Sequence, residues 1–122
     1  MELANIAAAE AFTTKDGSTI REVAGRVALP AAHQSLAEAT VPVGSATTAH
    51  YHHAAEELYF FTAGRGRLRI GDDERDVAPG DCAVIPPGAE HKLTNTGDEP
   101  LVLLCCCAPA YSHADTVLTE EA

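Results

Sequence analysis

The sequence predicts an all-β protein, a sandwich or a barrel, built as a single domain of 122 residues. Turn signals such as Asp16-Gly17, Gly64-Arg65-Gly66 and Pro79-Gly80 recur about every 8–12 residues. The stretches between them are short and mostly apolar, and helical periodicity is nearly absent. A chain of this length can bury a sizeable core, and neither a linker nor an internal repeat divides it.

The first half of the chain is expected to hold four strands after an irregular or short helical segment over residues 1–15. A strand over 20–29 follows the Asp16-Gly17 turn. A second, over 35–43, is rich in small and apolar residues and contains a proline near its end, which indicates an edge or a strand exit. A third contains 50–52, and a fourth, over 57–62, is apolar on both faces, as in a strand inside a barrel.

The second half continues with shorter strands between turns. Residues 67–70 alternate, with Leu68 and Ile70 inward and the two arginines outward. Further strands are expected over 75–77, 82–85 and 91–95, a continuously buried strand over 101–107, and a short strand over 116–119. The barrel would thus cover 16–108, and residues 109–122 would form a tail that packs on the barrel or on a partner subunit.

Composition excludes several partners. The net charge is −10 with only eight Lys and Arg residues, which argues against nucleic acid and anionic membrane surfaces. No apolar run approaches the length of a membrane span, and the N-terminus lacks the features of a signal peptide. Of four cysteines, three are consecutive (105–107) and would point to alternating faces of a strand, so a disulfide framework is not expected. These features favour a cytoplasmic location.

Four potential metal ligands stand in two spaced blocks. The first block holds His50, His52 and Glu57, framed by Gly44 and Gly64, and the second holds His91 after Gly80 and Pro86-Pro87-Gly88, three residues before Asn95. Side chains two apart on a strand share a face, so His50 and His52 can reach one point. Glycine at these turns is expected where the backbone needs positive φ or a close approach.

These two blocks resemble the conserved motifs of the cupin superfamily. The 15 residues between Gly64 and Gly80 are typical of small bacterial single-domain cupins, and the likeness spans roughly residues 44–95. The resemblance implies a double-stranded β-helix with jelly-roll topology. It also implies one divalent transition metal, Fe, Mn, Ni, Zn, Co or Cu, held by His50, His52, Glu57 and His91. Glu57 is preferred to Glu56 because six residues then separate it from Gly64.

Strand parity predicts what else faces the metal. Tyr59 and Phe61 share the parity of Glu57 and should face the cavity, where Tyr59 is either core or a catalytic phenol that orients a substrate or donates a proton. His53 should point outward. Cys105 and Cys107 share one face and are interpreted as small buried hydrophobic residues, of which one could line the cavity.

Three functions remain open. The first is a metal-dependent enzyme acting on a small organic molecule, with dioxygenase-like chemistry ahead of isomerase or lyase chemistry. The second is a non-catalytic module that binds a small molecule or a metal. The third, a sugar isomerase or epimerase, ranks lowest because the inward positions supply no basic residue to hold a phosphate. By analogy with other cupins, a homodimer is expected.

Overall fold

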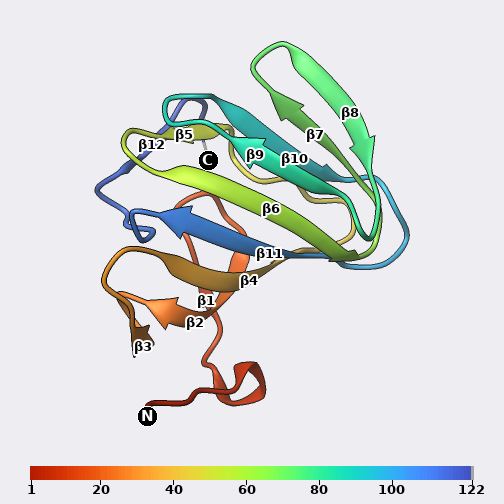
Figure 1. The fold of residues 1–122 in the computed structure, drawn as a ribbon. Coiled ribbons are helices and arrows are strands. Elements are labelled where there is room, and N and C mark those ends of the chain that lie inside the picture. Colours follow the sequence, from red (N-terminus) through yellow and green to blue (C-terminus); the bar gives the residue numbers. More distant parts are fainter. Residues whose placement is uncertain (122) are drawn as a thin grey trace.

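Two β-sheets share one hydrophobic core in the computed structural model, which describes residues 1–121 (Figure 1). The larger sheet has the order β1-β2-β4-β11-β6-β9, with β3 beside β2, and the smaller has the order β12-β5-β10-β7-β8. The larger sheet comprises β1 (Phe12–Thr13), β2 (Thr19–Gly25), β3 (Leu29–Pro30), β4 (Ser35–Val41), β6 (Glu56–Ala63), β9 (Cys82–Ile85) and β11 (Leu101–Ala108). The smaller comprises β5 (His50–His52), β7 (Gly66–Ile70), β8 (Asp73–Val77), β10 (His91–Asn95) and β12 (Thr116–Leu118).

This arrangement is the predicted all-β jelly roll, a double-stranded β-helix. Apart from β2–β3, the paired strands are antiparallel, and some neighbours come from distant parts of the chain, as β11 does between β4 and β6. The only helical element among residues 1–121 is a short 3-10 turn, η1 (Ile6–Ala8). No helix in that range is long and apolar enough to cross a lipid bilayer.

The core lies between the sheets and draws on both. Phe61 and Leu103 of the larger sheet and Leu68 and Leu93 of the smaller belong to one buried cluster. Each of these side chains is at most 5% exposed. Burying a side chain of this size contributes roughly 1.5–3 kcal/mol, so this cluster is the main source of the barrel's stability.

The motif glycines occupy the turns that position the sheets. Gly44, Gly64, Gly80 and Gly88 all have positive φ, between +77° and +95°, as the sequence predicts. Gly64 also has a packing requirement, because a Cβ there would lie 2.5 Å from the carbonyl oxygen of Pro100. Substitution at Gly64 would therefore strain the backbone and displace the loop before β11.

Two expectations about burial were wrong. The strand over 57–62 carries apolar residues on both faces, as expected, but it is not enclosed inside the barrel: Tyr59 is buried, whereas Leu58 and Phe60 are exposed on the outer face. Likewise β11 is fully buried only at alternate positions near its start and at Cys107, while the intervening side chains are half-buried. Both strands lie in a sheet that has one face toward the core and one face away from it.

The strand expected over 20–29 ends early, at Gly25. Glu22, itself only 6% exposed, accepts hydrogen bonds from the backbone N–H groups of Val27 and Ala28 at 2.6 and 2.7 Å. These bonds hold a turn immediately after Gly25, whose φ is +146°. The side chain of Glu22 thus ends the strand by competing for backbone donors.

Residues 109–121 pack on the barrel of their own chain. Strand β12 pairs with β5, with Thr116 opposite His52 and Leu118 opposite His50. Before it, the Asp115 carboxylate accepts hydrogen bonds from the N–H groups of Ala54 and Ala55 at 2.7 and 3.0 Å. The tail therefore covers the strand that carries two of the three clustered histidines.

Candidate metal centre

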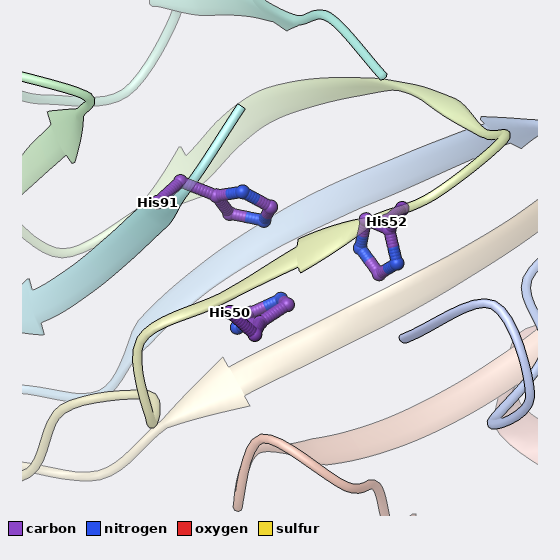
Figure 2. Close-up of side chains that lie close together, drawn as sticks. All are labelled: His50, His52 and His91. Carbon is purple, nitrogen blue, oxygen red and sulfur yellow. The ribbon is translucent and has the colours of Figure 1, made fainter. Parts of the chain in front are cut away.

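Three histidines meet between the sheets. His50 and His52 come from β5, and His91, at the start of the neighbouring β10, stands opposite His50 in the strand register. Figure 2 shows their rings pointing toward one another. One nitrogen from each ring lies within 4.8 Å of the other two, and all three side chains are at most 3% exposed.

Hydrogen bonds fix the tautomer of each ring. Nδ1 of His50 faces the carbonyl oxygen of Thr48 at 2.7 Å, and Nδ1 of His91 faces that of Ala89 at 3.0 Å. A carbonyl only accepts, so both Nδ1 atoms carry the proton and both Nε2 atoms carry a lone pair. The two Nε2 atoms are thereby available as ligands.

The Nδ1 atom of His52 is also protonated, because it faces the hydroxyl of Thr116. The Thr116 hydroxyl donates to the carbonyl oxygen of Ser112 at 2.9 Å, so it accepts from Nδ1 of His52, 3.1 Å away. With Nδ1 protonated in each ring, Nε2 is the atom that each histidine can offer to a metal, once His52 has lost the proton that its Nε2 donates to Glu57 at 3.0 Å. Within residues 1–121, Nε2 of His91 is a buried polar atom without a hydrogen-bond partner, an expensive arrangement unless a cation or proton occupies the centre.

Glu57 joins the cluster from β6. Its Oε1 lies 3.0 Å from Nε2 of His52 and 3.5 Å from Nε2 of His91. Burial opposes ionisation, but the hydrogen bond from Nε2 of His52, the contact with His91 and the charge of the two rings outweigh it and lower the pKa of Glu57 to about 2. The carboxylate is thus ionised at neutral pH, and its other oxygen accepts from the thiol of Cys107 at 3.2 Å.

The histidines differ in their affinity for protons. Burial, followed by the neighbouring His91, lowers the pKa of His50 below its usual 6.5. Burial also opposes protonation of His52, but the hydrogen bond and charge of Glu57 prevail and raise its pKa above 6.5. Without a metal, a proton shared between His52 and Glu57 relieves the repulsion of the facing lone pairs.

The cluster opens into a cavity of about 50 Å³. Its walls are largely apolar, with Ile20, Val41, Leu93 and Leu103 among them, and no Lys or Arg within residues 1–121 lines it. A volume of this size holds a few water molecules, so the space suits a small ligand.

The other side chains predicted to face the cavity divide into two groups. Tyr59 lines it, with its ring centre 5.8 Å from that of His91, and burial raises the pKa of its phenol well above 10. The prediction for Phe61 was wrong, because Phe61 lies deeper in the core, away from this cavity. Cys105 and Cys107 line the cavity, whereas His53 is exposed, as parity predicts.

Two residues of the centre escaped the sequence analysis. Thr116 was expected only as the start of a short strand, yet it orients His52. Asp16 was noted only as a turn signal, yet its Oδ2 lies 3.6 Å from Nε2 of His50 and its side chain is 14% exposed. No spacing to the histidines marks either residue, since both arrive through long-range pairing.

The donor set fits a metal. Three imidazole nitrogens and a carboxylate suit a borderline divalent ion, and the unpartnered Nε2 of His91 is the kind of orphaned atom that such an ion would satisfy. The structure brings the three predicted histidine ligands together and places Glu57 against two of them, His52 and His91. The role of these four residues as ligands stays a prediction. The three histidines form a potential divalent metal site.

Comparison with known proteins places this geometry in a family. The model for the cupin domain matches residues 37–107. An uncharacterized protein from Methanocaldococcus jannaschii is 46% identical over 109 residues, which cover 89% of this chain and 87% of the relative. A glucose-6-phosphate isomerase from Thermococcus litoralis is 32% identical over 82 residues, which cover 62% of this chain and 43% of the isomerase.

A solved structure shows the same fold. The oxalate decarboxylase of Lactobacillus farciminis, in its formate complex, superposes with a TM-score of 0.76 over 91% of this chain and 33% of its own, at 24% identity. At this identity the likeness concerns the fold alone. With the family match over more than half of its length, the chain belongs to the cupin superfamily as a small single-domain member.

Proposed function

We propose that this cupin binds one divalent transition metal through His50, His52, Glu57 and His91 and acts as an enzyme on a small organic molecule there. The observation that carries the proposal is the convergence of three Nε2 atoms, each oriented by a hydrogen bond at Nδ1 of the same ring, beside an ionised carboxylate. Ligands held this way lose little entropy on binding an ion.

The proposed ion supplies Lewis acidity or, if it is redox-active, a site for O₂. Four protein ligands leave one or two positions of a five- or six-coordinate ion for a small molecule, as catalytic sites require. The phenol of Tyr59, protonated at neutral pH because burial raises its pKa, is a hydrogen-bond donor that lines the cavity. Within this class we place dioxygenase-like chemistry first.

The lining also bears on the substrate. The residues around the cavity include Asp16, Glu22 and Glu57 but, within 1–121, no Lys or Arg, so a phosphorylated sugar would meet acidic groups and no cation of the chain. This argues against a sugar-phosphate isomerase despite the similarity to the glucose-6-phosphate isomerase. A small neutral molecule, or one that reaches the metal through its own oxygen atoms, fits better.

Oxygen consumption separates the enzyme from its main alternative, a non-catalytic binding module. The protein is loaded with Fe(II) under anaerobic conditions, mixed with a panel of small carboxylic and phenolic compounds, and then exposed to O₂. We expect at least one compound to change the metal spectrum and to trigger O₂ uptake. Tight binding without turnover would favour the non-catalytic module. Absence of both responses would exclude the oxygenase.

We further propose that the outer face of the larger sheet binds a second copy of the chain. Leu36, Cys106, Leu58 and Val84 are cross-strand neighbours and form one apolar row over β4, β11, β6 and β9. The leucines and the valine are 38–56% exposed, and Phe60 beside them is 44% exposed. A contiguous apolar patch of this kind favours burial in a symmetric dimer.

We also propose a cytoplasmic location, because the four cysteines are free thiols, as a reducing compartment favours.

A further inference from the structure

Asp16 belongs to neither motif block, yet its carboxylate enters the metal centre. It lies in the turn between β1 and β2, and its Oδ2 is 3.6 Å from Nε2 of His50. Glu57 contacts His52 and His91, whereas Asp16 contacts His50, so each of the three Nε2 atoms has a carboxylate oxygen within 3.6 Å.

The turn holds this carboxylate in place. Oδ1 accepts hydrogen bonds from the hydroxyls of Thr14 and Ser18, at 2.7 and 2.6 Å, and from the backbone N–H of Ser18 at 2.9 Å. The backbone carbonyl of Asp16 accepts from the N–H of Thr48 at 2.7 Å, which ties the turn to the segment leading into β5. With Oδ1 fully engaged, Oδ2 is directed at the cavity.

Two acceptors face each other at this point. Nδ1 of His50 donates to Thr48, so its Nε2 presents a lone pair toward the negative Oδ2 of Asp16. Such a pair is stabilised when a cation lies between the two atoms. Ligand atoms about 2.0–2.2 Å from one ion and separated by 90–120° lie about 3–3.7 Å apart. The separation of 3.6 Å is within this range, as is that between Glu57 and His91, 3.5 Å. Within residues 1–121, only the three histidines have ligand atoms that all lie within 4.8 Å of one another, so the carboxylates of Asp16 and Glu57 would have to shift toward a common ion when it binds.

We infer that Asp16 is a fifth protein ligand to the divalent metal, supplied by the N-terminal turn. The inference rests on the proposed metal centre and deepens it. A fifth ligand occupies a position that the four-ligand set leaves open, so an incoming anion or substrate competes with Asp16 for the ion. The β1–β2 turn thereby becomes part of the site and limits access to the metal.

Cobalt(II) is the probe, because its visible spectrum reports coordination number. Asp16→Asn keeps an oxygen that can accept from Thr14 and Ser18 while removing the charge that faces His50. We expect it to weaken cobalt affinity about tenfold, to alter the visible spectrum, and to increase the affinity of the loaded protein for azide. Asp81→Asn is the matched control, since Asp81 caps a turn through the N–H of Ala78 and lies away from the histidines. It should behave as the wild type.

The outcomes separate the two ideas. Wild-type cobalt affinity, spectrum and azide affinity in Asp16→Asn, with circular dichroism and melting temperature also unchanged, would overturn the role of Asp16 and leave the four-ligand centre standing. Failure of the wild-type protein to bind cobalt at all would instead contradict the metal centre itself. Should Asp16→Asn unfold, Thr14→Val with Ser18→Ala provides the second test. It removes two of the three hydrogen bonds to Oδ1 but keeps the charge, and its cobalt spectrum must change for the inference to hold.

Discussion

Replacing Thr116 with valine tests whether the hydrogen bond from Nδ1 of His52 to Thr116 leaves Nε2 as the metal-binding atom of this ring. Valine keeps the shape of threonine but removes the hydroxyl that accepts from Nδ1 of His52 at 3.1 Å and donates to the carbonyl of Ser112 at 2.9 Å. Thr116 is 2% exposed, so water cannot easily replace it. Removing a residue that hydrogen-bonds to a metal ligand typically lowers the affinity for the metal about 10–100-fold, or by about 1.4–2.7 kcal/mol.

The assay is calorimetric titration of cobalt(II) or zinc(II) into the metal-free protein. Losing the buried hydrogen bond also lowers the free energy of unfolding by about 1–3 kcal/mol, which urea denaturation of the metal-free variant measures separately. Thr62→Val is the matched control, because its hydroxyl donates to the carbonyl of Val102 on an exposed part of the sheet. Thr116→Val with wild-type metal affinity, at unchanged stoichiometry, would refute the tautomer assigned to His52.

Three further predictions concern the pH dependence, the phenol and the oligomeric state. The pKa of His52 is raised above 6.5 mainly by Glu57 against the effect of burial, so below that pKa a proton must leave before the metal binds. Metal affinity should therefore begin to fall at a pH above 6.5 and keep falling on acidification, with proton release in calorimetry, and a rise on acidification would contradict this. Tyr59→Phe should keep full metal content but slow turnover of any substrate found in the oxygen panel by about 100-fold, and an unchanged rate would assign Tyr59 to packing. Phe60→Asp should convert the proposed dimer to a monomer in sedimentation velocity, and an equally stable dimer would place the interface elsewhere.

The sequence predicted the strands well because their signals are local. Turn glycines at positive φ and the two-residue period of strands depend only on neighbouring residues, so β5, β7, β9 and β10 appeared close to their observed bounds. The same period placed His50, His52 and Glu57 on inward faces and turned His53 outward.

Parity could not predict depth or long-range pairing. It gives the face of a strand but not the position along the barrel, which is why Phe61 was wrongly expected in the cavity that Tyr59 lines. Thr116 lies 64 residues from His52, and their contact depends on the register of β12 against β5. Asp16 reaches His50 only because the β1–β2 turn packs on the segment before β5.

The same limit explains the errors in burial. Apolar composition alone suggested that β6 is enclosed on both faces, but Leu58 and Phe60 lie on the outer side of the larger sheet. Whether a second chain covers that side depends on a partner surface, which no pattern within a single strand reveals. Composition therefore identified an apolar strand correctly and its surroundings incorrectly.

Metal stoichiometry and affinity of the His91→Ala variant test the central claim most directly. His91 is 0% exposed, belongs to the second motif block, and carries the unpartnered Nε2. We predict that the wild-type chain binds one ion in calorimetry. His91→Ala, with its fold confirmed by circular dichroism, should lose metal affinity by about 100-fold or more. This loss exceeds the one expected for Thr116, which contacts a ligand but not the metal. Full metal content and wild-type affinity in His91→Ala would contradict the four-ligand centre.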